Sequence, residues 1–345
     1  MVVKMKVVNF KINSFQGILL FMLAMLLIIF SKSAREGAYD GLKLAMNTVL
    51  PSLLPLLIIF LTVMKTGAKS LFSKLFGFVS RWVFNLPEPT ISSFLFGMLG
   101  GYPTGALLCE EMFESNDLSR EQAKRMMCFN FCGGCGFIIT AVGSVVFNDT
   151  KIGILLYFSN VISAVLLGFM LSFKEKRIKK GTYSFEEYVP LGDALCASTN
   201  KACKSVLLIA SYIILFSAVC NIFKIPDIFL PILEITNGVC NADFSLPLTS
   251  AFLSFGGICI HLQLSSVMRK LGLKYMEFLL FRVLGGIISY FVMKLLLLFF
   301  PASIDVFAPV NAPIKFSSVN ITLSVLLIIG CFVSVLDLNG RKRKI

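Results

Sequence analysis

The stretch "FLFGMLGGYPTGALL", residues Phe94 to Leu108, interrupts a strongly apolar region with four glycines and one proline. Pro103 removes a backbone donor, and its ring clashes with the preceding turn of a helix. Backbone groups left unpaired in lipid cost several kcal/mol each, so such a break survives only where protein or a water-filled cavity surrounds it. We therefore expect a re-entrant hairpin of two short helices, with its tip near Gly101–Thr104.

The composition is that of a membrane protein. The chain has 345 residues, of which 57% are hydrophobic and 15% are charged, and its mean hydropathy is +0.84. Soluble domains are typically about 45–50% apolar and about 25% charged. Several apolar runs reach the roughly 18–20 residues that a helix needs to cross a bilayer. The sequence predicts an all-α polytopic protein of the cell membrane that is not an enzyme and uses no cofactor.

The net charge of +13 is concentrated between the apolar runs, as in "KEKRIKK" at Lys174–Lys180 and "RKRK" at Arg341–Lys344. Such clusters are typical of loops on the cytoplasmic side, and nothing in the chain indicates nucleic-acid binding. With Lys65–Arg81 in the cytoplasm, a hairpin returns Glu110–Arg125 to that side, and the next two spans bring "KEKRIKK" there as well. A straight crossing would place that cluster outside, so charge placement favours the hairpin.

The chain divides into an N-terminal span in 1–40, a first repeat in 41–173, a basic cytoplasmic linker in 174–200, and a second repeat in 201–345. The second repeat ends with a span near Ser318–Leu336 and a basic tail. Each half has one glycine pair in an apolar segment and another in a later helix, at Gly100–Gly101 and Gly133–Gly134, then at Gly256–Gly257 and Gly285–Gly286. Such weak symmetry predicts two inverted repeats, each with a re-entrant hairpin and a broken transmembrane helix. The alternative is a coincidence of glycine pairs.

The second half leaves its topology open. A hairpin at Leu246–Met268 would place both "RKLGLK" at Arg269–Lys274 and the C-terminal "RKRK" outside, whereas a plain crossing would place both inside. The sequence alone does not decide between a span and a re-entrant segment.

Exposed backbone and half-helix N-termini at the breaks can bind a solute, and such N-termini favour anions. We expect the first tip to contribute Gly100, Gly101, Tyr102, Pro103, Thr104 and Gly105, and the second to contribute Gly256 and Gly257. A packing role for these glycines is the alternative. "CGGC" at Cys132–Cys135 resembles a metal or redox motif, but no second pair follows, so we expect its glycines to unwind a helix.

Arg282 is the most informative polar residue, because an ionisable group inside a span is expensive and indicates a functional site. Its alternatives are snorkelling and pairing with Glu277. Asn130 holds the matching place in the first half. Further candidates are His261 with Gln263, and the polar cluster Glu234, Thr236 and Asn237, each of which has a structural alternative. For an anionic cargo, Arg282→Ala should abolish binding without unfolding the protein.

The segments "GGYPTGA" and "FGGICIHLQ", with a Gly-rich break after a capped helix, resemble the YlbJ-type sporulation integral membrane proteins. These belong with the nucleoside-recognition, or Gate, domains and are similar to concentrative nucleoside transporters, in which two re-entrant hairpins and two broken helices surround a midplane site. The residues that match the motifs are Gly101, Tyr102, Pro103, Gly105 and Ala106, then Gly256, Gly257, His261 and Gln263. Gly100 stands where the family usually has Ser, and "FCGGCGF" replaces its Asn/Ser-rich break.

The resemblance implies passage of a small aromatic carboxylate, dipicolinate, across a forespore membrane by alternating access. The departures from the motifs leave another cargo open, such as a nucleoside or other neutral solute. A further alternative, of a different class, is a non-transporting membrane scaffold. The expected partners are the lipid bilayer, a small-molecule solute and a coupling cation, and the nucleoside-carrier analogy suggests a homo-oligomer.

Overall fold

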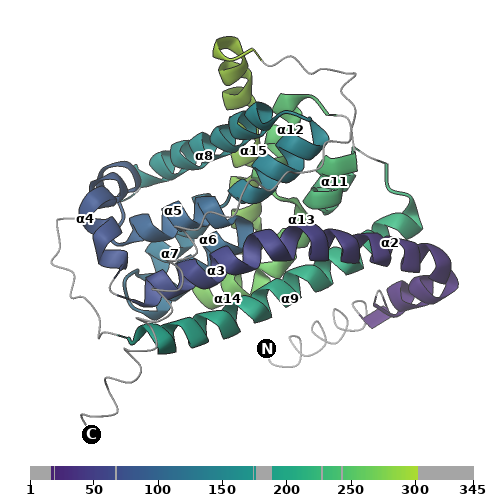
Figure 1. The fold of residues 1–345 in the computed structure, drawn as a ribbon, viewed down its shortest axis with the longest axis horizontal. Helices are drawn as coiled ribbons and strands as arrows, with labels where there is room; N and C mark the ends of the chain where they lie inside the picture. The colour runs from purple at the N-terminus through teal and green to yellow at the C-terminus, as the bar shows by residue number, and fades with distance from the viewer. Residues whose placement is uncertain are drawn as a thin grey trace, which may run out of the picture.

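The computed structural model describes residues 17–301, apart from 19, 67, 174, 176–188, 227 and 242–243. The described residues form helices and their connections, with no strand among them, which confirms the predicted all-α class (Figure 1). Five helical stretches are long and apolar enough to cross a membrane: Ser31–Lys65, Thr150–Ser172, Leu191–Phe223, Leu246–Gln263 and Tyr275–Phe299. The predicted C-terminal span lies outside the described residues.

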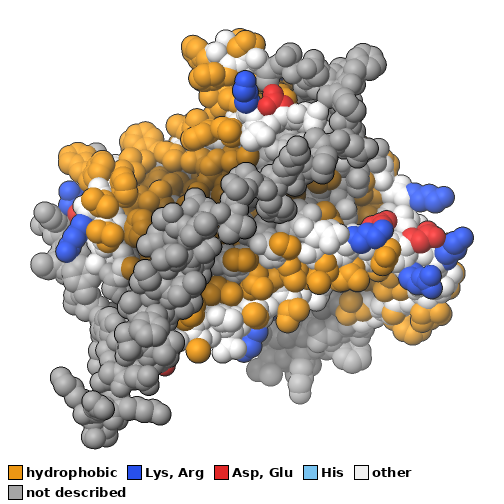
Figure 2. Space-filling model, in the orientation of Figure 1, with side chains coloured by type: hydrophobic (Ala, Val, Ile, Leu, Met, Phe, Trp, Pro, Cys, Tyr) orange, Lys and Arg blue, Asp and Glu red, His pale blue; other side chains and the backbone are white. Residues whose placement is uncertain are grey.

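The surface agrees with a bilayer environment. Figure 2 shows apolar side chains spread over the visible face, with charged side chains gathered at its margins. Many large apolar side chains are exposed, including Leu207, Phe291 and Leu298, which a soluble protein of this size would bury. The predicted multi-pass membrane location is therefore supported by the surface as well as by helix length.

The first long stretch is one continuous helical rod. It consists of α2 (Ser31–Leu44), the π-helical turn η1 (Ala45–Val49) and α3 (Leu50–Lys65). The wide turn η1 directly precedes Pro51, whose ring and missing N–H disturb the hydrogen-bond ladder of the preceding turn. The rod packs along α9 (Leu191–Phe223), and α4 (Lys69–Val79) and η2 (Ser80–Phe84) follow it.

The helices α5 (Thr90–Gly100) and α6 (Tyr102–Glu114) pack against each other and form the expected hairpin. Both of its ends lie near Lys69. Ser92 Oγ donates to the carbonyl of Lys69 at 3.3 Å, and Lys69 Nζ lies 2.7 Å from Asp117 Oδ2, just after α6. The chain therefore turns back at Gly101. That the hairpin enters the membrane without crossing it remains our prediction.

The helix α7 (Arg120–Phe129) begins at the predicted capping box. Ser119 Oγ accepts from the Gln122 amide at 3.3 Å, and the Gln122 side chain accepts from the Ser119 amide at 2.9 Å. An irregular segment then covers residues 130–134, including the first three residues of "CGGCG", so the chain unwinds there as expected. The π-helical η3 (Phe137–Val146) and α8 (Thr150–Ser172) follow.

In the second half, α9 begins at Leu191, so the end of the segment expected to be a linker is helical. The helices α10 (Leu230–Leu233) and α11 (Ile235–Asn241) pack together. The remaining helices are α12 (Leu246–Phe255), α13 (Gly257–Gln263), α14 (Ser265–Leu271) and α15 (Tyr275–Phe299).

The expectation that Gly285–Gly286 breaks a helix is wrong, because α15 runs unbroken through both glycines. They serve close packing instead. A Cβ on Gly285 would lie 3.2 Å from Ser254 Oγ, and a Cβ on Gly286 would lie 3.1 Å from the Ala251 carbonyl. The absence of side chains lets α15 approach α12 closely, as small residues do between membrane helices. The break in this half lies at Gly256–Gly257.

The structure also favours a crossing at Leu246–Met268. The helix α12 packs on α8 and α15, whereas α13 packs on α9 and α10, and α12 and α13 lack the extensive mutual packing of α5 and α6. Lys270, at the far end, has its ammonium 3.0 Å from Glu110 Oε1. The "RKLGLK" segment thus lies at the same end of the molecule as the two ends of the first hairpin. A crossing at Leu246–Met268 requires this, because it places the segment on the cytoplasmic side.

Candidate solute site

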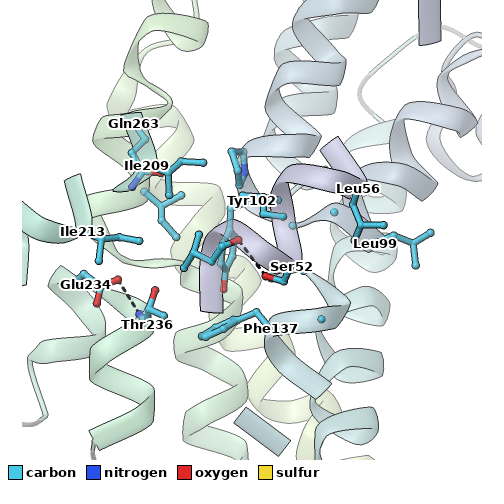
Figure 3. Close-up of a pocket in the computed structure, with 18 residues that line it drawn as sticks. Ser52, Leu56, Leu99, Tyr102, Phe137, Ile209, Ile213, Glu234, Thr236 and Gln263 are labelled. Carbon is cyan, nitrogen blue, oxygen red and sulfur yellow. Dashed lines mark hydrogen bonds between the residues drawn. The ribbon is translucent and has the colours of Figure 1, made fainter. Parts of the chain in front are cut away.

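A cavity lies where the tip of the first hairpin meets the break after α7, the joint between α10 and α11, and the helix α13. Figure 3 shows Ile209, Ile213, Glu234, Thr236 and Gln263, from the second half of the chain, facing Ser52, Leu56, Leu99 and Phe137 from the first. Gly100, Gly101, Tyr102, Pro103, Gly134 and Gly136 also line it. Seven predicted site residues therefore meet here: Gly100, Gly101, Tyr102, Pro103, Glu234, Thr236 and Gln263.

The conformation of the hairpin tip depends on a glycine and on a proline that follows it. Gly101 has φ of +97°, a conformation that side chains rarely adopt, and a Cβ there would lie 2.7 Å from the Gly134 amide nitrogen. Pro103 occupies the first turn of α6, where its missing N–H leaves no helical bond unmade. The remaining free N–H groups of that turn lie at the cavity end of α6.

Glu234 occupies the joint between α10 and α11 and is 1% exposed. Its Oε1 accepts from the Thr236 amide at 2.9 Å, and its Oε2 accepts from the Asn237 amide at 2.7 Å. The carboxylate thereby caps the first turn of α11. Among the described residues that line the cavity it is the only charged one, and no described Lys or Arg forms an ion pair with it.

Gln263, at the end of α13, is 6% exposed and lines the same cavity. Its Nε2 contacts Cys259 Sγ at 3.4 Å, while its Oε1 has no hydrogen-bond partner among the described residues. A buried acceptor without a partner is costly. This oxygen is therefore available to a donor that enters the cavity.

Arg282 does not line the cavity in this conformation. It is 1% exposed, and its Nη2 donates to the Cys128 carbonyl in the last turn of α7. The guanidinium lies 4.4 Å from the centre of the Phe131 ring, and the described residues include no carboxylate in ion-pairing contact with it. A cation at a helix C-terminus is favoured by the helix dipole. Direct contact between Arg282 and an anionic solute stays a prediction.

Asn130, in the irregular segment after α7, forms hydrogen bonds with both helices of the first hairpin. Its Nδ2 lies 3.2 Å from the carbonyl oxygens of both Ser93 on α5 and Gly105 on α6. Gly105 has no side chain to obstruct this approach. Thr104 is buried behind the tip, outside the cavity lining, and its hydroxyl has no partner among the described residues.

His261 forms a hydrogen bond with the end of a broken helix. Its Nε2 lies 2.9 Å from the carbonyl oxygen of Phe255, which the break at Gly256 leaves without a helical partner, so this nitrogen carries the donated proton. Gly256 and Gly257 have φ of +86° and +76°, which the turn between α12 and α13 requires. None of these three residues lines the cavity.

Asn237 lies on the other side of Glu234. Its Nδ2 donates to Ser217 Oγ on α9 at 2.6 Å, and it lines a second cavity together with Glu234. Sequence reasoning missed Ser52, Phe137, Ile209 and Ile213, which line the first cavity. Ser52 directly follows a proline in an apolar span, which is a weak indication of a site. The three apolar residues could not have been found from the sequence, because side chains of the same kind occur throughout the membrane spans.

No protein-family model matches the chain, and no solved structure matches it either. The chain is similar to the "Sporulation integral membrane protein YlbJ" of Bacillus subtilis (strain 168), with 25% identity over 313 residues, covering 75% of this chain and 77% of that protein. This similarity confirms the resemblance to YlbJ-type sporulation integral membrane proteins that the glycine motifs predict, and the relative, like this chain, is an integral membrane protein.

Proposed function

We propose that the protein is a membrane carrier that moves a small solute by alternating access at the cavity around Glu234 and Gln263. The observation that carries this proposal is the cavity itself, which interrupted helices from both halves of the chain enclose. Irregular backbone inside a membrane is stable where it lines such a cavity. In secondary transporters the substrate site lies at the interface of the two repeats, next to broken helices.

The order of elements supports two repeats. In the first half, the hairpin α5–α6 is followed by the broken helix α7–η3 and the long helix α8. In the second half, the pair α10–α11 is followed by the broken helix α12–α13 and, after α14, the long helix α15. The first hairpin starts near Lys69, and its second helix is bonded to Lys201 in the first half of α9. The helix α10 starts near Lys224, which directly follows the other end of α9. We infer that α10–α11 takes the place of the second hairpin, which the sequence alone leaves open at Leu246–Met268.

The cavity measures about 70 Å³, which holds a few water molecules but not a ring-bearing solute. Sites for drug-sized ligands are several times larger, on the order of 300–1,000 Å³. A carrier with this site must therefore separate its two halves to load a solute. We take the described conformation as the closed state of the cycle.

A small aromatic carboxylate such as dipicolinate is our first choice of cargo. The free N–H groups at the start of α6 suit an anion, the apolar lining suits a ring, and the similar protein from Bacillus subtilis is named for sporulation. A neutral solute such as a nucleoside is the second candidate. It is favoured by the cavity's described lining, which contains acceptors at Glu234 and Gln263 but no Lys, Arg or His.

The test is solute exchange by the full-length protein in proteoliposomes, with labelled dipicolinate and labelled uridine in parallel. Gln263→Met should reduce exchange at least tenfold, because it removes the unpaired acceptor while keeping the volume. Leu262→Met, an exposed neighbour on the same helix, is the matched control. Exchange of dipicolinate supports the anion carrier, and exchange of uridine moves the cargo to nucleosides. If folded protein exchanges neither solute, the carrier proposal fails and the scaffold becomes the better explanation.

A further inference from the structure

Glu234 separates two cavities. The inner one is the candidate solute site, and the second, of about 190 Å³, is lined by residues of α2, α9 and the α10–α11 joint. Asp40 and Lys224, both exposed, lie in the wall of this second cavity, so it opens toward the water at that end. Glu234 is the only described residue that lines both cavities. Its carboxyl group is therefore the described polar group that both cavities share.

The carboxyl group is arranged for a proton better than for a metal ion. Each oxygen already accepts one backbone N–H, so a positive dipole end points at the carboxylate from the Thr236 and Asn237 side. A metal cation would have to share the carboxylate with both of these donors. A proton needs only one remaining lone pair on one oxygen.

No described lysine or arginine forms an ion pair with Glu234. The titratable groups that face Glu234 are Cys220 on α9, Cys240 on α11, Cys259 on α13 and Tyr102 on α6, which are neutral in their ordinary forms. Asp40 of α2 and Lys224 at the end of α9 lie in the wall of the second cavity. When Glu234 is ionised, hydrogen bonds from the Thr236 and Asn237 amides stabilise its charge, without a paired cation among the described residues.

We propose that Glu234 takes up a proton from the second cavity and that this neutralisation admits an anionic solute to the first, which makes the protein a proton–solute symporter. This inference rests on the proposed function. Hydronium in the second cavity donates its proton to a Glu234 carboxylate oxygen and leaves as water. The solute anion then enters without facing a second negative charge in a confined, poorly solvated space. When the other side opens, the solute leaves and the carboxyl group returns its proton to water there.

The first test uses the wild-type protein in proteoliposomes that contain a pH-sensitive dye. An acidic exterior should drive labelled dipicolinate at least tenfold above equilibrium, with acidification of the interior, and a protonophore should abolish both effects. Solute exchange at equal pH should slow as the pH rises from about 6 to about 8.5, a range in which ordinary carboxylic acids of the solute stay ionised. Accumulation that follows a sodium gradient instead, or ignores both gradients, overturns the proton assignment.

The variant Glu234→Gln should lose gradient-driven accumulation and interior acidification, and the pH profile of its exchange should be flat whatever its absolute rate. Glu277→Gln, at an exposed glutamate of α15 outside both cavities, is the control and should behave as wild type. Elution in gel filtration and thermal unfolding report whether the variant folds. If it does not fold, the wild-type gradient measurements decide alone. If the wild-type protein exchanges solute but the exchange does not depend on protons, the proton inference fails and the proposed carrier function stands. If the folded wild-type protein exchanges no solute, the proposed carrier function fails.

Discussion

A cluster of ion pairs holds the closed structure together at one end of α6. The Glu111 carboxylate accepts from Lys65 at the end of α3 and from Lys201 on α9, at 2.7 Å in the second case. Lys270 on α14 bonds Glu114 and lies 3.0 Å from Glu110. The two halves of the chain thus meet at this end through charges on α6, and Glu111 is the member that accepts hydrogen bonds from two lysines.

The substitution Glu111→Gln should destabilise the fold by about 2 kcal/mol. Exposed ion pairs contribute up to about 1 kcal/mol, and a broken buried pair costs about 3–5 kcal/mol. The Glu111 side chain is 11% exposed and each lysine 25%, so each pair falls between these limits, nearer the lower one. Two pairs at roughly 1 kcal/mol each give the estimate, which is a change of about 30-fold in the folding equilibrium.

The assay is reversible unfolding in mixed micelles with increasing SDS, followed by circular dichroism. Glu121→Gln is the matched control, because the Glu121 side chain is 75% exposed and its one ion pair among the described residues is with Lys124 on the same helix. The control should change the unfolding free energy by less than about 0.5 kcal/mol. Equal effects of the two substitutions, or no effect of Glu111→Gln, would show that the cluster does not hold the halves together.

Three further outcomes are expected. Gly101→Ala should destabilise the protein by about 2 kcal/mol or more, because the new Cβ would sit on a residue with positive φ and would collide with backbone. Gly136→Ala is the control and should be tolerated, because its Cβ would lie 3.5 Å from the nearest atom. Thermal unfolding of the two variants makes the comparison. Tyr102→Phe leaves the buried Leu253 carbonyl without the hydroxyl that donates to it at 2.5 Å, and should cost about 1–3 kcal/mol in the same assay. Burial raises the pKa of Glu114, but its bond from an α14 lysine and the charge of an α9 lysine outweigh this and lower the pKa overall. This contribution to stability should be present above about pH 4.5 and lost as the pH falls further, and Glu114→Gln should flatten that part of the pH–stability curve.

The hairpin could be predicted from the sequence because its signals are local. Gly101 adopts a positive φ, and Pro103, two residues later, lies in the first turn of α6; both residue types favour a turn at such a place. The capping box at Ser119 is equally local and begins α7 as predicted. Charge placement predicts in addition that the hairpin returns to the side from which it enters, because a straight crossing would separate the basic segments, and this re-entry stays a prediction.

The glycine pairs of the second half could not be interpreted in this way. A glycine pair in an apolar run allows a break, as at Gly256–Gly257, and equally allows two helices to pack closely, as at Gly285–Gly286. The difference depends on the neighbouring helix, which is far away in the sequence. The short pair α10–α11 escaped notice as a structural unit because its joint is marked by Glu234 rather than by glycine.

Polar residues at membrane depth fall into two groups that the sequence does not separate. A broken helix leaves carbonyl groups without partners, and in lipid these need donors from elsewhere in the protein. Tyr102 donates to Leu253 and His261 to Phe255 at the end of α12, and Arg282 donates to a carbonyl at the end of α7. These side chains stabilise the breaks.

Glu234 and Gln263 differ from these three residues. Neither donates to a carbonyl freed by a helix break; the Glu234 carboxylate has backbone donors on one side only, and Gln263 Oε1 has no partner among the described residues. Both acceptors line the same cavity. An acceptor without a donor and a buried carboxylate without a paired cation both destabilise a closed membrane protein, so a ligand in this cavity that binds both groups would offset that cost. A proton on Glu234 and a solute beside Gln263 would satisfy both groups, which is why binding and coupling are expected to share this cavity.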